Sequence, residues 1–348
     1  LGEVGKGAYI AFNILNLGRF SLGAGTMGAA KDQLRVAVKY AGERQQFGKP
    51  IASFGMIQHK LGEMAARIYA IESALYRTAN QMDQVKATGE MVHTTKPGYF
   101  RAIEEFALEC SAVKVAGSEI LTFVADEALQ IHGGYGFTEE YAPARATRDA
   151  RINRIFEGTN EINRLFIPTN LLRRAAKGKL ALMAAAMSAY AEAQKEPAAE
   201  KTGDDLATAL AVLARAKKAL LLLFGGAHQK FGDKIIHEQE VLAVLSDLTI
   251  ELFLGESAVL RAMKARARGA GSVLTDLALI WVNDSVARME NRARDAIAHM
   301  ASGDELKLQL GLARKMLRWT PLDTVTLRRR VATRLGAVGS YPALLASK

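Results

Sequence analysis

Cysteine, proline and aromatic residues are scarce in this sequence, and it has no long apolar run. Its 348 residues include one cysteine, Cys110. A single thiol can form neither an internal disulfide nor a multi-thiolate zinc site, which makes a reducing compartment the default expectation. The longest uninterrupted apolar stretch, Ala219 to Ala227, has nine residues, whereas a membrane-spanning helix needs roughly 20. The sequence therefore predicts no transmembrane helix.

The composition that remains is typical of a helical globular chain. Apolar residues make up 49% and charged residues 24%, which excludes disorder and collagen and is enough for two hydrophobic cores. Only 7 Pro and 30 Gly interrupt long stretches of Ala, Leu, Glu, Lys and Arg, which lose little side-chain freedom in a helix. Four histidines lack the partnered spacing of metal ligands, so no metal site is predicted; they are His59, His228, His237 and His299.

Three segments of the first half carry helical signals. Apolar residues from Phe54 to Leu75 recur at alternating steps of three and four, which places them on one face of a helix. The same spacing runs from Ile103 to Val124, just after Pro97, a residue that a helix tolerates at its start. A third helix is expected from about Tyr9 to Gly42, where small residues permit close approach of a neighbour. We therefore predict an all-α fold in which residues 1–177 form a helical bundle.

The second half begins with a change of composition. From Ser188 to Asp205 the sequence turns to Ala, Glu, Lys, Gln, Pro and Gly without a hydrophobic stripe, and we interpret residues 178–205 as a linker. Leucines return at helical spacing after it, beginning at Leu206 and Leu210. Residues 206–348 are therefore expected to form a second helical bundle.

Most of the net charge of +10 also lies in the second half. Residues 1–174 contain 21 Lys and Arg against 18 Asp and Glu, and residues 175–348 contain 25 against 18. The basic clusters are Arg261, Lys264, Arg266 and Arg268, followed by Arg314, Lys315, Arg318, Arg328, Arg329, Arg330 and Arg334. A solvated helix face explains them most simply; contact with an anionic membrane surface or another subunit is the alternative. Nucleic-acid binding is not expected, because no aromatic interleaving or docking motif accompanies the clusters.

One motif matches a nucleotide-binding fingerprint without its setting. Residues 23–28 read Gly-Ala-Gly-Thr-Met-Gly, and Glu43 lies 20 residues beyond the first glycine. That fingerprint binds a dinucleotide only when a strand precedes it in a βαβ unit. No strand-like run precedes Gly23, so we interpret these glycines as a site of helix packing.

Three further motifs occur in a characteristic order. Residues 40–51 read Tyr-Ala-Gly-Glu-Arg-Gln-Gln-Phe-Gly-Lys-Pro-Ile, residues 130–137 read Gln-Ile-His-Gly-Gly-Tyr-Gly-Phe, and residues 151–164 read Arg-Ile-Asn-Arg-Ile-Phe-Glu-Gly-Thr-Asn-Glu-Ile-Asn-Arg. Together they resemble the C-terminal helical domain of the flavin-dependent acyl-CoA dehydrogenases over roughly residues 1–174. The Asn16-Leu-Gly-Arg19 segment, the Phe-Glu-Gly-Thr-Asn form and the helical extension look most like the very-long-chain branch.

The resemblance implies α,β-dehydrogenation of an acyl-CoA thioester, with FAD as cofactor and Glu157 as the base that removes the α proton. A base for this task must be a carboxylate that substrate binding shields from water, so that its proton affinity rises toward the working pH. Gly158 lets the backbone approach a ligand closely, and Thr159 or Asn160 can cap the next helix. The alternative is a carboxylate that satisfies amides at that helix start.

The resemblance also assigns two sets of binding residues. Cofactor contacts are expected from Arg44, Phe47, Gln58, Gln130, Ile131, Gly133, Gly134, Thr159, Asn160 and Glu161. Substrate contacts are expected from Asn16, Leu17, Gly18, Arg19, Phe156 and Gly158. Arg44 supplies planar donors suited to a pyrophosphate, and in the family it contacts FAD across a dimer interface.

Structural alternatives exist for several of these residues. Gln130 to Gly134 also suit a helix C-cap, Gln58 could simply cap its own helix, and Arg19 could form a structural ion pair. His132 is not expected to act as an acid, base or ligand. Cys110, on an apolar stripe, is expected to be a core residue.

The resemblance implies partners and missing parts. The family carries an N-terminal helical domain and a β-domain ahead of this region, and the first residues, Leu1 to Gly7, read as a loop continuing from something upstream. We therefore expect the C-terminal part of a longer enzyme, inactive alone. The implied partners are an electron-transferring flavoprotein and a second copy, as a homodimer or dimer of dimers. The implied location is the cytoplasm of a bacterium, the membrane periphery, or the mitochondrial matrix of a eukaryote.

Two other functions stay open at this point. A non-enzymatic assembly or scaffold relative would use the helical surfaces and not need Glu157. An acyl-CoA oxidase would share the first half-reaction and pass electrons to oxygen.

Overall fold

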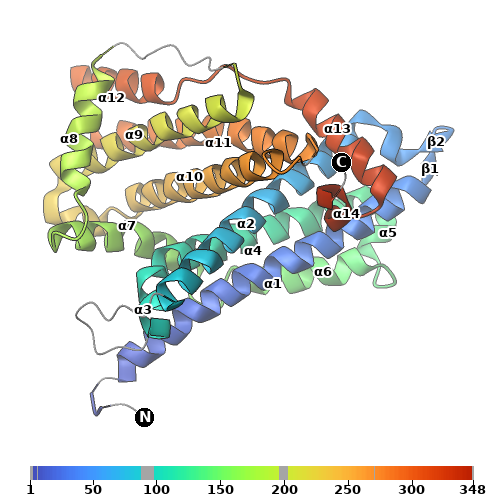
Figure 1. Cartoon of the computed structure of the whole chain (residues 1–348), viewed down its shortest axis with the longest axis horizontal. Helices are drawn as coiled ribbons and strands as arrows, with labels where there is room; N and C mark the ends of the chain where they lie inside the picture. The colour runs from blue at the N-terminus through green and yellow to red at the C-terminus, as the bar shows by residue number, and fades with distance from the viewer. Residues whose placement is uncertain (1–2, 6, 88–97, 196–202, 270, 347–348) are drawn as a thin grey trace. The chain divides into compact units, whose positions relative to one another are not determined.

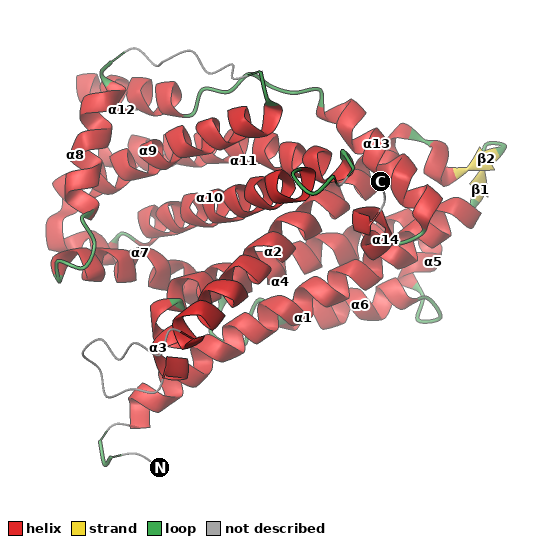
Figure 2. Cartoon of the chain, viewed as in Figure 1, coloured by secondary structure: helices red, strands yellow, loops and turns green. Residues whose placement is uncertain are grey.

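The computed structural model describes residues 3–5, 7–87, 98–195, 203–269 and 271–346. These residues are almost entirely helical, with one short antiparallel hairpin (Figure 2), so the predicted all-α class is confirmed. The chain divides into two compact units, one formed by residues 1–163 with residues 328–347 and the other by residues 164–327. Pro97 and the first two residues lie outside the described part of the chain.

The first unit is built on long helices that run alongside one another (Figure 1). Its elements are α1 (Gly7–Glu43), β1 (Gln45–Gln46), β2 (Lys49–Pro50), the 3-10 turn η1 (Ile51–Ser53), α2 (Gly55–Ala87), α3 (Gly98–Glu105), α4 (Ala107–His132), α5 (Gly134–Phe137), α6 (Ala142–Ile152) and α14 (Tyr341–Ala346). Helix α7 (Asn160–Ala176) leads from this unit into the second, and α13 (Thr324–Val338) leads back.

Helices α1 and α4 approach so closely that glycine is required at two positions. A Cβ atom on Gly23 would lie 3.0 Å from the carbonyl oxygen of Val113, and one on Gly117 would lie 2.5 Å from Oγ1 of Thr26. The glycines of residues 23–28 therefore lie in the middle of a helix, and the first of them serves the helix packing that the sequence predicted.

The apolar stripe from Ile103 to Val124 belongs to two helices, where the sequence analysis expected one. The backbone of Phe106 leaves the helical conformation, with φ −94° and ψ 22°, and α4 begins after it. Ile103 before the break and Cys110 after it are both buried. Hydrophobic spacing could not reveal the break because the same face stays buried on both sides of it.

The last residues of the chain pack on the first unit, whereas the sequence assigned them to the second bundle. Arg328, predicted as part of a basic cluster, is 5% exposed and donates to Oε2 of Glu63 from Nε and Nη2, at 3.0 and 2.7 Å. A Cβ on Gly62 would lie 2.7 Å from the carbonyl oxygen of Arg328. Tyr341 donates to Oε2 of Glu72 at 3.0 Å. One arginine of the second cluster is thus an internal partner, unavailable to a membrane or subunit.

The second unit contains a helix inside the predicted linker. Its elements are α8 (Leu182–Ala193), α9 (Asp205–Phe231), the 3-10 segment η2 (Gly232–His237), α10 (Gln239–Arg266), α11 (Val273–Met300) and α12 (Gly303–Met316). Helix α8 buries Leu182 and three alanines at helical spacing against α9. The sequence analysis missed α8 because alanine is small enough to pack in a core yet gives a weak hydrophobic stripe. In the described part of the chain, no helix has the length and apolar character needed to cross a membrane.

The Glu63–Arg328 pair predicts a pH-dependent stability. Burial alone would raise the pKa of Glu63, but the charges of Arg67 and Arg328 lower it to about 2. The pair therefore stabilises the fold fully above the ordinary carboxyl pKa of 4.5, and this contribution is lost as the pH falls toward about 2. We expect Glu63→Gln to lower the free energy of unfolding by about 3 kcal/mol at pH 7, measured by urea denaturation, with the deficit shrinking toward acid pH.

The control for this variant is Glu139→Gln, which removes an exposed pair with Arg148. It should leave the urea midpoint nearly unchanged. Equal effects of the two substitutions at pH 7 would contradict a structural role for the buried pair.

Candidate functional site

Glu157 lies in a turn between α6 and α7 and has a left-handed backbone. Its φ angle is 60°, and Gly158 follows with φ 79°. For a residue other than glycine, this backbone conformation costs about 1 kcal/mol of free energy. It persists only where surrounding contacts enforce it. The amide of Asn160 closes the turn by donating to the carbonyl of Arg154 at 3.0 Å.

The carboxylate of Glu157 lies directly on α1. A Cβ atom on Gly18 would lie 2.7 Å from Oε2, 2.8 Å from Cδ and 2.9 Å from Oε1 of Glu157. Only a hydrogen atom fits between the helix and the carboxylate. The structure thus brings together two residues, 139 positions apart in the sequence, that the motifs had assigned to substrate binding and to catalysis.

Arg19 and Asn16, which we expected on the substrate side, hold this turn from α1. Both are 8% exposed. Arg19 donates from Nε to the carbonyl of Glu157 at 3.2 Å and from Nη1 to Oδ1 of Asn16 at 2.9 Å. The structure therefore gives Arg19 a contact with the backbone of Glu157, which the sequence analysis did not predict.

Two residues that the sequence analysis missed hold the turn from the other side. Lys114 of α4 donates to the carbonyl of Gly158 at 2.8 Å and to Oδ1 of Asn160 at 2.7 Å. Asn163 donates to the carbonyls of Gly158 at 2.8 Å and Thr159 at 3.0 Å. Lys114 lies four residues after Cys110, on the buried apolar face of the same helix. A charged residue on an apolar face was the one feature of the sequence that could have drawn attention to it.

The residues after Glu157 have different surroundings. Asn160, expected to contact FAD, is completely buried and also donates to Ser118 and Glu119, at 3.0 and 3.1 Å. Thr159 caps α7 by accepting from the amide of Ile162 at 3.3 Å, as the sequence had suggested. Glu161 and Phe156 are exposed, and Leu17 is half-buried.

A second group of expected site residues surrounds a cleft of about 490 Å³ in the same unit. Its lining consists of Tyr40, Arg44, Gln46, Ile51, Ile131, His132, Gly133, Gly134, Tyr135 and Thr138. Arg44 lies over the ring of Tyr135, 5.7 Å from its centroid. Phe47 does not line the cleft; it is 89% exposed at the tip of the β1–β2 hairpin. Gln58 and Gln130 do not line it either.

One wall of this cleft is packed by aromatic rings, and another leaves room for a ligand. His132 stacks on Tyr40 with ring centroids 4.0 Å apart, and its Nδ1 lies 2.7 Å from the carbonyl oxygen of Ala128. Burial lowers the pKa of His132. Gly133 combines φ 61° with ψ −142°, a conformation that is essentially restricted to glycine, whereas a Cβ on Gly134 would meet no atom within 4 Å. Beside the guanidinium of Arg44, this open backbone fits the adenosine diphosphate end of a dinucleotide.

The two groups lie toward opposite ends of α1. Gly18 contacts Glu157 and Tyr40 lines the cleft, and 22 helical residues between them correspond to about 33 Å. The expected residues at the Glu157 turn and those that line the cleft therefore form two separate groups within one chain. We call these two groups half-sites.

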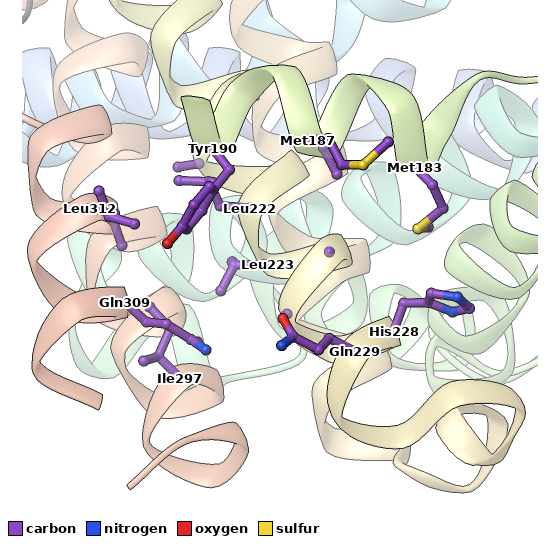
Figure 3. Close-up of a pocket in the computed structure, with 15 residues that line it drawn as sticks. Met183, Met187, Tyr190, Leu222, Leu223, His228, Gln229, Ile297, Gln309 and Leu312 are labelled. Atoms are coloured by element: carbon purple, nitrogen blue, oxygen red, sulfur yellow. The ribbon is translucent and has the colours of Figure 1, made fainter. Parts of the chain in front are cut away.

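A cleft in the second unit contains none of the expected residues (Figure 3). It measures about 490 Å³ and lies among α8, α9, α11 and α12. Met183, Met187 and Tyr190 reach into it from α8, opposite Leu223 and Gln229 of α9 (Figure 3). Among the described residues, no three His, Cys, Asp or Glu side chains gather where they could hold a metal ion.

Comparison with known proteins identifies the family. Residues 5–172 and residues 215–315 each match a family described as "Acyl-CoA dehydrogenase, C-terminal domain". A "Probable acyl-CoA dehydrogenase" of Bacillus subtilis is 41% identical over 346 residues, which cover 98% of this chain and 58% of that protein. The chain belongs to the acyl-CoA dehydrogenase family.

Two further relatives place it within that family. The crystal structure of an acyl-CoA dehydrogenase complexed with FAD from Bacillus anthracis aligns with a TM-score of 0.93 and 41% identity over 98% of this chain and 59% of that one. The very long-chain specific acyl-CoA dehydrogenase of Rattus norvegicus is 43% identical over 167 residues, 48% of this chain and 23% of that protein. The two Bacillus relatives match 98% of this chain. The chain thus spans less than two thirds of the length of either one.

The contact between Gly18 and Glu157 predicts an unusual response to alanine. Gly18→Ala should lower the free energy of unfolding by about 1–3 kcal/mol, because the added methyl group overlaps the carboxylate. Gly28→Ala on the same helix meets no atom within 4 Å and should raise stability by about 0.5–1 kcal/mol through helix propensity. Urea denaturation measures both values. Stabilisation by both substitutions would rule out the tight contact.

Proposed function

We propose that this chain provides the catalytic base and half of the FAD site of an acyl-CoA dehydrogenase. The observation that carries the proposal is the carboxylate of Glu157, which projects from a left-handed turn against Gly18. Arg19 and Lys114 hold the backbone of this turn by donating to the carbonyls of Glu157 and Gly158. A base fixed by contacts on both sides needs little reorganisation when a thioester binds beside it.

In the proposed reaction the α C–H bond of an acyl-CoA breaks and Glu157 takes the proton. Bound FAD would accept the hydride from the β carbon, which leaves a double bond between the two carbons. Ile155 and Phe156 are 47% and 46% exposed beside Glu157. Their apolar side chains would help to shield the carboxylate from water, which raises its proton affinity when substrate is present.

The two half-sites support a homodimer. Arg44, Ile131, Gly133 and Gly134 would receive the pyrophosphate and adenosine of one FAD, while Glu157 would act beside the flavin of another. With about 33 Å of helix between the half-sites, each complete site would need a second copy of the chain. Since the matched relatives are longer, the missing walls would come from further parts of the protein.

Three finer features are part of the proposal. We infer a long acyl chain from the similarity to the rat very-long-chain enzyme over 167 residues. We infer an electron-transferring flavoprotein as acceptor and a role in fatty acid β-oxidation from membership of the family. The cofactor is inferred from the fit of the cleft and from the FAD-bound relative.

The role of the base is tested with Glu157→Gln in the FAD-loaded protein that contains this chain. Removing a general base should lower dye reduction with a long-chain acyl-CoA at least 1000-fold, while the flavin absorbance per protein stays unchanged. Glu139→Gln, which removes an exposed ion pair with Arg148, is the control and should keep full activity.

The outcomes separate the competing functions. Full dye reduction by Glu157→Gln would contradict the assigned base and favour an assembly or scaffold role. Rapid reoxidation of the reduced wild-type protein by oxygen, in preference to the flavoprotein, would instead identify an oxidase.

The cofactor half-site has its own prediction. Arg44→Gln should weaken FAD binding by about 10-fold or more, because a charge-assisted contact to the pyrophosphate is lost. Equilibrium dialysis of the full-length protein measures this. Arg35→Gln, which removes an exposed arginine near the same end of α1, should retain wild-type affinity. Equal FAD affinities of the two variants would show that FAD does not bind in this cleft.

A further inference from the structure

Lys114 is a completely buried lysine whose ammonium group contacts the turn that carries Glu157. Its relative exposure is 0%, and its Nζ donates to the carbonyl of Gly158 and the side chain of Asn160, at 2.8 and 2.7 Å. Burying a cation is costly. Two neutral donors could satisfy the same acceptors, so the charge itself calls for an explanation.

The two acceptors belong to Gly158 and Asn160, one and three residues after Glu157 in the chain. Lys114 therefore ties down the segment after Glu157 from α4, while Arg19 holds the carbonyl of Glu157 from α1. Because Glu157 has a left-handed backbone, any loosening would let it relax toward an ordinary conformation. Such a change would rotate the Cα–Cβ bond and redirect the carboxylate.

Charged groups of neighbouring elements act on Lys114. Burial and the charge of Arg19 lower its pKa, the charges of Glu161, Glu119 and Glu157 oppose them, and the net result is a pKa of about 8. The ammonium group therefore stays mostly protonated at neutral pH. Because a charged donor makes stronger hydrogen bonds than a neutral one, it holds its two acceptors more firmly.

We propose that Lys114 is a positioning residue for the base: it fixes the Gly158–Asn160 segment so that the carboxylate of Glu157 points at the substrate. This inference rests on the proposed role of Glu157.

The test compares wild type with Lys114→Met in the FAD-loaded protein. Methionine fills the same volume without charge or hydrogen bonds. We expect kcat to fall about 100-fold, as for a reacting group displaced by about 1 Å, with KM for acyl-CoA within threefold. A fall in kcat without a matching rise in KM would show that the base is misdirected while acyl-CoA still binds.

Lys31→Met is the matched control. Lys31 is a half-buried lysine of the same unit that pairs with Glu72, so its loss also destabilises the fold but leaves the Glu157 turn untouched. It should keep a kcat within threefold of wild type. A purely structural role for Lys114 would make the two variants alike in kcat and KM, and that result would overturn the proposal.

Failure of this inference can be distinguished from failure of the proposed function. If Glu157→Gln is inactive while Lys114→Met keeps the wild-type kcat, only the role of Lys114 is refuted. If Glu157→Gln stays active, the assigned base is refuted.

Lys114→Gln carries the same test if the methionine variant does not fold. Its amide can donate to one acceptor but has no charge. Its kcat should fall less than that of the methionine variant, because one hydrogen bond to the segment is kept. A wild-type kcat would refute the positioning role.

Discussion

The close approach of α1 and α4 at two glycines is the constraint on which the Glu157 site depends. Gly23 is one turn beyond Arg19 on α1, and Gly117 is nearly one turn beyond Lys114 on α4. Because the backbones touch here, the side chains one turn earlier meet the same short loop from two directions. A bulkier pair of residues at the crossing would separate the helices and pull the two cations away from that loop. The same helix crossing therefore determines both the packing of α1 against α4 and the position of the side chains that hold the Glu157 loop.

The glycines of this unit act in three different ways. At Gly23 and Gly117 they let helices touch, at Gly18 the missing side chain leaves room for a carboxylate, and at Gly134 it leaves room beside a cleft. Sequence inspection treats these positions alike because each is simply a small residue. Only the atoms around each one distinguish packing from binding.

The fold was largely predictable, and the detail of the site was not. Helical spacing revealed α2 and most of α4, and the three motifs pointed to Glu157 and Arg44. Helix α8 was not predicted because its buried face consists mostly of alanine, which is only weakly hydrophobic and gives no clear apolar stripe. Lys114 and Asn163 were missed because their importance depends on a loop that reaches them from far along the chain. The inward position of Arg328 was hidden for the same reason: a cluster of arginines gives no sign of which one has a buried carboxylate partner.

The return of the last helices to the first unit has a consequence for how the protein is made. Glu63 is synthesised 265 residues before Arg328. At translation speeds of about 5–20 residues per second, its carboxylate waits for tens of seconds without its partner. During that time the surface of α2 that later receives α13 is open to water and to other chains. Nascent chains of this protein should thus be most vulnerable to aggregation late in synthesis, when the second unit has emerged and the segment that completes the first unit has not.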